Sequence, residues 1–249
     1  MQVHTVGTRQ FWATGLEVAE RTKFLNCSLF VNWVNCLDSR IRLERVKIVS
    51  VDYKPNGDAI FAKLSVTAFD DNRIGKQIIP DVIFLRGNSV AIFPILISKE
   101  TGQKYVVFTE QVRLPFGGQL VEIPAGMMDQ EKNFIGVAAK EFKEEIGIAI
   151  TAEDLTALTA NRPFHQPPLM FPRGIAVSPG VCDEMMQFYL FRKTLPQADI
   201  EVLQGALTGN QNEGESICLK IVPWEDVPSA TCDGKFFTAY ALMHLQGLI

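Results

Sequence analysis

Three glutamates, Glu141, Glu144 and Glu145, occupy positions i, i+3 and i+4 of one short stretch of the chain. In an α-helix these positions lie on one face, so the three carboxylates project together. Like charges so close repel each other, and each such pair costs roughly 0.2–0.5 kcal/mol on a bare helix. Hard divalent cations such as Mg²⁺ prefer carboxylate oxygens and also hold phosphate groups. The spacing therefore indicates either a metal site for phosphate chemistry or a solvated acidic helix face balanced by neighbouring lysines.

The elements around the glutamates favour the metal site. Apolar residues recur at helical spacing over residues 133–145, and Gly147 is placed to end that helix. A short apolar strand, predicted at residues 120–123, leads into the break Pro124-Ala125-Gly126. A loop of this kind can add a backbone carbonyl to the oxygen ligands that the helix supplies.

The segment from Gly126 to Ile148 resembles the Nudix box, in which Gly, five residues, Glu and seven residues precede Arg-Glu-apolar-x-Glu-Glu-x-Gly-apolar. The positions that match the box are Gly126, Glu141, Phe142, Glu144, Glu145, Gly147 and Ile148. Lys132 stands where the family has Glu, and Lys140 stands where it has Arg. In the family this Glu and Arg support the loop and helix, and Lys is a poorer bidentate partner than Arg. The three carboxylates are intact, so we interpret the departure as altered support with retained chemistry.

Three further regions resemble the ADP-ribose and ADP-sugar diphosphatase branch of the same family. They are residues 109–115 followed by 120–127, residues 178–184 and residues 212–217, in the family's order and spacing. Plant-type ADP-sugar diphosphatases and animal UDP-sugar diphosphatases are similar as well. The resemblance covers most of the chain from residue 81 onward, and it implies the Nudix fold. That fold is an α/β (α+β) sandwich with a mixed β-sheet between helices.

The resemblance also implies a role for each matched residue. Glu141, Glu144 and Glu145 are expected to ligate Mg²⁺, or Mn²⁺ in its place, with the Ala125 carbonyl as a further ligand. Arg113 is expected to contact the diphosphate, and its alternative is a surface ion pair.

Two roles fall on later segments. Glu184 is expected to reach the metal-bound diphosphate or its water, unless it is an ordinary exposed glutamate. The general base lies on the late acidic loop, where Glu213 and Glu215 both qualify. We favour Glu215 because it directly precedes a strand predicted to begin at Ser216.

The function implied is metal-dependent hydrolysis of the diphosphate of a nucleoside diphosphate sugar. ADP-ribose or ADP-glucose would yield AMP and a sugar phosphate. One alternative is a UDP-sugar or dinucleotide diphosphatase. Another, motivated by Lys132 and Lys140, is a catalytically weak Nudix domain that binds a nucleotide sugar as a sensor.

The chain is expected to divide into a small N-terminal β-rich subdomain, residues 1–80, and a Nudix domain, residues 81–249. Two alternating runs, residues 46–51 and 59–68, flank a Pro-Asn-Gly turn and predict a hairpin. Relatives with such a subdomain often form homodimers through it, which implies a homodimer here. Phe30 and Trp33 are either a platform for stacking adenine or core residues.

Composition narrows the class of protein. Of 249 residues, 47% are hydrophobic and 21% are charged, as in an ordered soluble domain. The net charge of −4 and the scattered basic residues argue against generic binding to nucleic acid or to a membrane surface. The N-terminus has no pattern of a secretory signal, and five widely spaced cysteines favour free thiols. A cytoplasmic location is the expectation.

Overall fold

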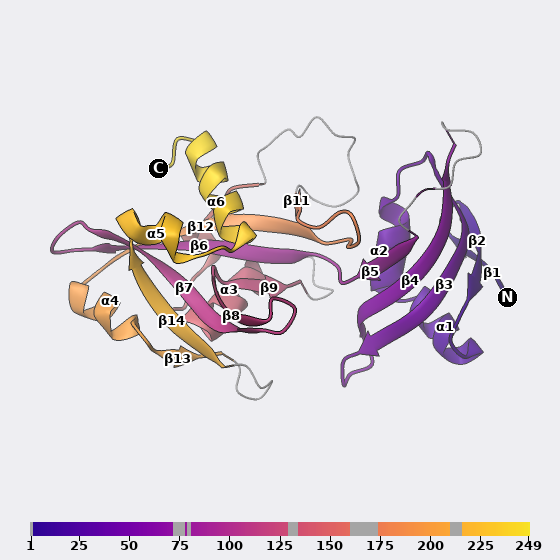
Figure 1. Cartoon of the computed structure of the whole chain (residues 1–249), viewed down its shortest axis with the longest axis horizontal. Coiled ribbons are helices and arrows are strands. Elements are labelled where there is room, and N and C mark those ends of the chain that lie inside the picture. The colour runs from indigo at the N-terminus through magenta and orange to yellow at the C-terminus, as the bar shows by residue number, and fades with distance from the viewer. Residues whose placement is uncertain (1, 72–77, 79–80, 129–133, 160–173, 210–215) are drawn as a thin grey trace. The chain divides into compact units, whose positions relative to one another are not determined.

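The computed structural model describes residues 2–71, 78, 81–128, 134–159, 174–209 and 216–249 of the chain. Six side chains of helix α3 lie outside this description: Phe134, Ile135, Val137, Ala138, Lys140 and Glu141. Contacts divide the chain into two compact units, one of residues 1–88 and 164–186, the other of residues 89–163 and 187–249. Figure 1 labels their elements.

The first unit is built on a five-stranded sheet in the order β1-β2-β3-β4-β5. Its strands are β1 (Gln2–Val6), β2 (Arg9–Thr14), β3 (Ile41–Tyr53), β4 (Ala59–Asp70) and β5 (Val82–Leu85). Strand β2 runs parallel to β3, and the other neighbouring strands are antiparallel. Helices α1 (Val18–Leu25) and α2 (Ser28–Cys36) supply the crossover that a parallel pair needs.

One face of this sheet forms the core of the first unit. Alternate residues of β4, from Ala62 through Leu64 and Val66, are buried, and they belong to one apolar cluster with Phe24 and Phe30 of the helices. On the opposite face side chains remain accessible, because successive residues of a strand point to opposite sides. Trp12 and Phe84 are exposed there.

The predicted hairpin is confirmed. Strands β3 and β4 are antiparallel, and the turn is closed by the Lys54 N–H donating to the Asp58 carbonyl at 2.8 Å. Gly57 takes a positive φ of 87° in that turn. Helices α1 and α2 were not predicted, because both are short and α2 is apolar on several sides, so neither shows a clear helical period.

The second unit contains a mixed sheet in the order β10-β12-β6-β7-β14-β13, with β8 beside β7 and β9 beside β6. Its strands are β6 (Ser89–Ser98), β7 (Lys104–Arg113), β8 (Gly118–Glu122), β9 (Ala125–Met127), β10 (Leu155–Ala157), β12 (Met185–Leu195), β13 (Leu207–Thr208) and β14 (Ile217–Pro223). The first residues of β12 belong to the first unit, where they pair with β11 (Ile175–Ala176).

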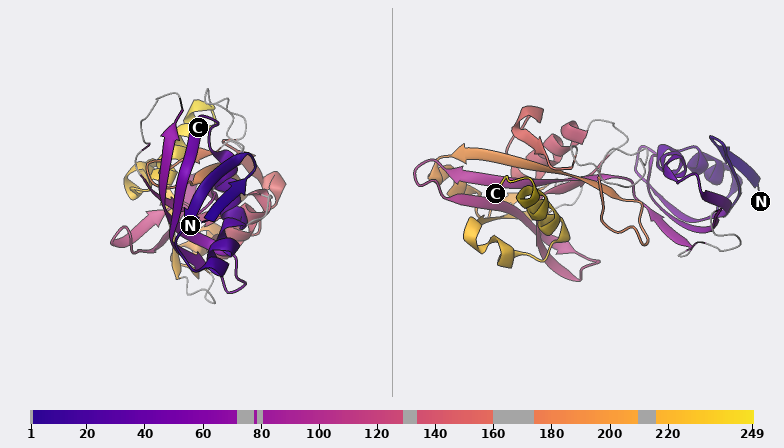
Figure 2. Two further views of the ribbon diagram at one scale, coloured as in Figure 1. Left: turned by 90° about the vertical axis from the view of Figure 1, so that its right-hand side faces the viewer. Right: turned by 90° about the horizontal axis from the view of Figure 1, so that it is seen from above.

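Helices cover both faces of this sheet. They are α3 (Phe134–Ile146), α4 (Gln197–Leu203), α5 (Val227–Ala230) and α6 (Gly234–Leu245), with short 3₁₀ turns at Ala152–Asp154 and Trp224–Asp226. Phe142 of α3 packs in one cluster with Ile92, whereas the next strand residue, Phe93, stacks on Phe236 of α6 at 5.4 Å. Consecutive strand residues point to opposite faces, so α3 and α6 lie on opposite sides of the sheet (Figure 2). The predicted mixed sheet between helices is confirmed.

Among the described helices, none combines the length and the apolar character needed to cross a membrane.

The backbone of Ile48 packs closely against Gly15 in the first unit, and a side chain introduced at Gly15 tests this packing. A Cβ at Gly15 would lie 1.9 Å from the Ile48 carbonyl oxygen, and the φ of 83° adds strain. We expect Gly15→Ala to lower the free energy of unfolding of the full chain by about 2–4 kcal/mol, measured by urea denaturation. The matched control is Gly7→Ala, where φ is also positive but the nearest atom lies at 3.7 Å. It should lose only about 1 kcal/mol. Equal losses in the two variants would show that the clash is absent.

Candidate active site

Helix α3 carries the three glutamates as predicted. The helix runs from Phe134 to Ile146, one residue later at each end than expected, so Glu141, Glu144 and Glu145 fall on adjoining positions of its last two turns. Gly147 ends the helix with a φ of 78°, and its N–H donates to the Lys143 carbonyl at 3.0 Å. The predicted stop is therefore confirmed.

The Glu145 carboxylate is buried against the strand that precedes the helix. Only 5% of Glu145 is exposed, and its Oε2 accepts a hydrogen bond from the Ala125 N–H at 3.2 Å. Glu144 is partly buried, and the Glu141 side chain lies outside the described part of the structure. The structure thus brings together two members of the expected ligand set, Ala125 and Glu145.

Strand pairing shows where the Ala125 carbonyl points. The Ile92 N–H donates to the Pro124 carbonyl at 3.0 Å, and Ala125 is paired with Ala91. In an antiparallel ladder, hydrogen-bonded pairs alternate with pairs whose N–H and C=O point away from the partner strand. Ala125 is in a pair of the second kind. Its N–H goes to Glu145, and its carbonyl lies on the same outward edge.

This donor set fits a hard cation. The Ala125 carbonyl, Glu144 and Glu145 offer oxygen atoms only, which suits Mg²⁺ or Mn²⁺ better than a soft metal. Across the residues described, which leave out the Glu141 side chain, no three His, Cys, Asp or Glu side chains gather as a metal site. The backbone hydrogen bond fixes one Glu145 oxygen beside the outward edge of β9, as ligand-orienting contacts do in metal sites.

The last turn of α3 is joined to the start of the late acidic segment. The Thr208 hydroxyl donates to the Glu145 carbonyl, and the Gly209 N–H donates to the Glu144 carbonyl at 3.1 Å. These two donors satisfy helix-end carbonyls that have no partner inside the helix. Thr208 also pairs with Ile217 across β13 and β14, so the described strands that flank residues 210–215 lie side by side near this turn. Glu213 and Glu215 themselves, like Lys132, lie outside the described residues.

Arg113 lies at the end of β7 and forms an ion pair with Glu122, a partner that the sequence analysis did not identify. Its Nε donates to Oε1 of Glu122 at 2.6 Å. The Arg113 side chain is 41% exposed, whereas that of Glu122 is 3% exposed. Arg113 thus forms the ion pair that was its alternative, although its partner Glu122 is buried, and the contact with the diphosphate stays a prediction. In the sequence, Glu122 stands out as the one charged residue of the apolar strand predicted at residues 120–123.

Segment 178–184 lies in the first unit, and its acidic residues are bonded to the end of β5. Glu184 is 6% exposed, and its Oε2 lies 3.2 Å from Nη1 of Arg86. The alternative of an ordinary exposed glutamate is therefore wrong. The other oxygen of Glu184, Oε1, is buried and has no hydrogen-bond partner among the described residues.

The neighbouring Asp183 fastens the same segment through backbone groups. Its Oδ1 accepts the N–H of Arg86 at 2.8 Å and the N–H of Gly87 at 3.2 Å. Burial raises the pKa of the Asp183 carboxyl, although these two hydrogen bonds favour its charged form. Arg86 was missed by the sequence analysis, because nothing local to residues 82–88 shows that segment 178–184 packs on it.

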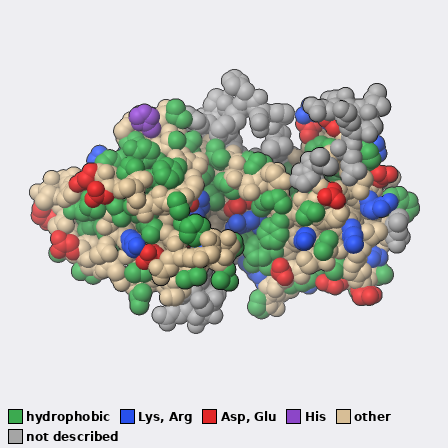
Figure 3. Space-filling view, viewed as in Figure 1, with side chains coloured by type: hydrophobic (Ala, Val, Ile, Leu, Met, Phe, Trp, Pro, Cys, Tyr) green, Lys and Arg blue, Asp and Glu red, His purple; other side chains and the backbone are tan. Residues whose placement is uncertain are grey.

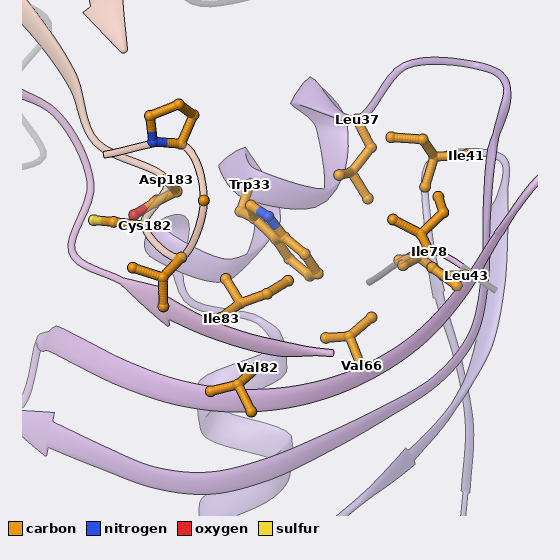
Figure 4. Close-up of a pocket in the computed structure, with 14 residues that line it drawn as sticks. Trp33, Leu37, Ile41, Leu43, Val66, Ile78, Val82, Ile83, Cys182 and Asp183 are labelled. Atoms are coloured by element: carbon orange, nitrogen blue, oxygen red, sulfur yellow. The ribbon is translucent and has the colours of Figure 1, made fainter. Parts of the chain in front are cut away.

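The first unit also contains a cavity of about 280 Å³, drawn in Figure 4. The indole of Trp33 faces it, together with apolar residues of β3 to β5 and with residues 179–183. The cavity has no Lys or Arg among the described residues that line it, so it suits an uncharged group better than a phosphate. Phe30 is fully buried, which makes it a core residue and excludes it from an adenine platform.

Comparisons with known proteins agree on a family. A model of the NUDIX domain matches residues 87–240. Nudix hydrolase 14, chloroplastic, of Arabidopsis thaliana is 34% identical over 248 residues, which cover 94% of this chain and 77% of that protein. The ADP-ribose pyrophosphatase of Bacillus subtilis is 28% identical over 153 residues, 59% of this chain and 68% of that protein.

A crystal structure of an ADP compounds hydrolase aligns with a TM-score of 0.48 and 19% identity, over 83% of this chain and 98% of the other. Since the domain model matches most of the chain and a relative at 34% identity spans nearly all of it, this protein belongs to the Nudix hydrolase family.

Proposed function

We propose that this hydrolase splits the diphosphate bond of a nucleoside diphosphate sugar, ADP-ribose or ADP-glucose, in the presence of Mg²⁺ or Mn²⁺. The products are AMP and a sugar phosphate. The observation that carries the proposal is the buried Glu145 carboxylate held beside the outward edge of Ala125. The name of one relative, an ADP-ribose pyrophosphatase, supports the substrate class.

Four groups are proposed to hold the metal: the carboxylates of Glu141, Glu144 and Glu145 and the Ala125 carbonyl. A divalent cation bound there would neutralise charge on the diphosphate and lower the pKa of a water molecule. The protein contributes orientation, because the Ala125 N–H holds one Glu145 oxygen in a fixed direction. Burial of Glu145 keeps water away from this side of the ligand set.

Arg113 and Glu184 are proposed to contact the substrate. A guanidinium offers a planar set of N–H donors that matches phosphate oxygens. Within the described part of the chain, Arg113 uses only its Nε in a hydrogen bond. The Arg113 side chain is 41% exposed. Glu184 is proposed to reach the metal-bound diphosphate or its water.

The general base is proposed to be Glu215 or Glu213, with Glu215 favoured because it lies two residues before β14 in the sequence. The described flanks support this choice, since Thr208 and Gly209 bind the backbone carbonyls of Glu145 and Glu144. The proposed base belongs to the segment that directly follows Gly209 in the sequence. Its role is to take the proton of the attacking water.

A substrate panel tests the proposed reaction. The purified protein is incubated with Mg²⁺ or Mn²⁺ and with ADP-ribose, ADP-glucose, UDP-glucose or NADH, and nucleotide products are separated by chromatography. We expect AMP from the ADP-sugars, at rates that fall to background when EDTA removes the metal. Faster cleavage of UDP-glucose or NADH would favour the alternative substrates. Tight binding of a nucleotide sugar without release of AMP or UMP would favour the sensor that Lys132 and Lys140 suggest.

A second prediction addresses the carboxylates of α3. Glu144→Gln removes a charged oxygen ligand, and we expect turnover of the preferred substrate to fall by about 100-fold or more at unchanged thermal stability. Glu153→Gln is the matched control, since it removes the same charge from an exposed residue outside the box. An unchanged rate in Glu144→Gln would remove Glu144 from the proposed ligand set.

The same assay separates the two candidates for the base. Glu213→Gln and Glu215→Gln are compared at saturating substrate. The variant of the true base should lose turnover while its KM stays close to that of the wild type, because a proton acceptor acts on the chemical step. Full activity in both variants would place the base elsewhere.

We also propose that residues 1–80 mediate a homodimer, while residues 81–249 carry the hydrolase chemistry. Trp12 is 45% exposed on the face of the first unit's sheet that lies opposite its core. Apolar side chains reach the surface among charged ones on the faces drawn in Figure 3. Large exposed aromatics of this kind are enriched at protein interfaces.

Equilibrium sedimentation at micromolar concentration tests the dimer. We expect twice the chain mass of 27.8 kDa for the wild type, and a shift toward the single-chain mass for Trp12→Lys. Val202→Lys, which charges an exposed apolar residue of α4, is the control and should stay dimeric. A monomeric wild type would overturn the proposal.

A further inference from the structure

The buried carboxylate of Glu122 is shared between two cations from distant parts of the chain. Its Oε1 accepts from Nε of Arg113 at 2.6 Å, and its Oε2 accepts from Nζ of Lys235 at 2.6 Å. The Glu122 side chain is 3% exposed, and that of Lys235 is 19% exposed. An isolated buried carboxylate is costly, so Glu122 needs both oxygens bound. Lys235 therefore determines whether the guanidinium of Arg113 must bind one or both oxygens of Glu122.

The N-terminus of α6 fixes Lys235 in this place. Asp233 caps the helix by accepting the Lys235 N–H at 2.9 Å, and the same oxygen lies 3.0 Å from the Lys235 Nζ. The other oxygen of Asp233 accepts the Ile123 N–H at 3.1 Å, and the Thr231 hydroxyl donates to the Val121 carbonyl. Residues 231–235 thus hold the backbone on both sides of Glu122, directly before the turn to Ala125.

The division of Glu122 between two cations decides what Arg113 can do. Within the described part of the chain, Arg113 bonds Glu122 through Nε alone. If Lys235 were absent, Oε2 would be left without its cation, and the guanidinium would turn to bind both oxygens in the bidentate manner that Arg favours. A guanidinium bound in that way has fewer N–H groups for another anion.

We infer that Lys235 is a positioning residue for the substrate's diphosphate. By occupying Oε2 of Glu122, it keeps Arg113 on Oε1 and leaves both Nη groups of Arg113 for the phosphate oxygens. The inference rests on the proposed function, in which Arg113 contacts the diphosphate. It adds a residue of α6, outside the box and outside the motifs of the sequence analysis, to the determinants of substrate affinity.

Kinetics of ADP-ribose hydrolysis with Mg²⁺ test this role. Lys235→Met keeps the apolar stem and removes the charge, and we expect its KM to rise about tenfold with less than about a threefold change in kcat. Lys235→Arg should restore KM to within about threefold, because it again places a cation on Oε2. In an Arg113→Met background, Lys235→Met should raise KM little further, because the group it positions is gone.

Two controls keep the outcome interpretable. Lys220→Met breaks another ion pair of the same unit, that with Glu110, and should leave KM unchanged. Calorimetry with the methylene analogue of ADP-ribose, which cannot be hydrolysed at the bridging atom, measures affinity without turnover. If Lys235→Met unfolds, Lys235→Gln takes its place in both measurements.

The outcomes separate the two claims. A wild type that hydrolyses or binds ADP-ribose while the Lys235 variants keep its KM and affinity overturns the inference alone. Equal losses in kcat and affinity that Lys235→Arg does not restore would show a merely structural role and also overturn it. A wild type that neither binds nor hydrolyses any member of the panel overturns the proposed function, and the inference with it.

Discussion

The hydrogen bond from the Ala125 N–H to the Glu145 carboxylate is the contact on which the candidate site depends. It joins the edge of the sheet to the helix that carries the acidic residues. It requires that β9 pair with β6 in the observed register, because only then do the N–H and carbonyl of Ala125 face away from the sheet. It also requires that α3 end where it does, since a shift by one residue would turn Glu145 through about 100°.

Two other buried carboxylates, Glu122 and Glu184, each bind at least one basic side chain. The negative charge of Glu122 is neutralised by ion pairs with Arg113 and Lys235. Glu122 therefore serves as a structural anion, even though it lies three residues before Ala125. Glu184 has one oxygen on Arg86 and a second oxygen with no partner in the described part of the chain. Glu122 and Glu184 therefore differ in whether both of their oxygens are bound by described residues.

Much of the fold and part of the candidate site were predictable because their signals are local. The helical period of α3, its stop at Gly147 and the β3–β4 hairpin each depend on residues within one element or one turn. Helices α1 and α2 were missed, since both are short and α2 is apolar on several sides, so neither shows a clear helical period.

Contacts between residues far apart in the sequence could not be predicted from such local signals. Glu122 and Lys235 are 113 residues apart, and the Asp183 contact with the Arg86 N–H spans 97 residues. No pattern within a window of the sequence encodes such pairs. The core position of Phe30 likewise follows from the packing of α2 on the sheet, which is set by the whole first unit.

The long span between strand β8 and helix α6 has a consequence for how the protein is made. The backbone of Val121 and Ile123 is held by Thr231 and Asp233, each contact separated by 110 residues. During synthesis the strand leaves the ribosome well before the groups that hold it. The chain must therefore carry Glu122 without Lys235 while some 110 further residues are added. The contacts that hold the backbone before Ala125 can therefore be completed only after residues 231–235 have been added.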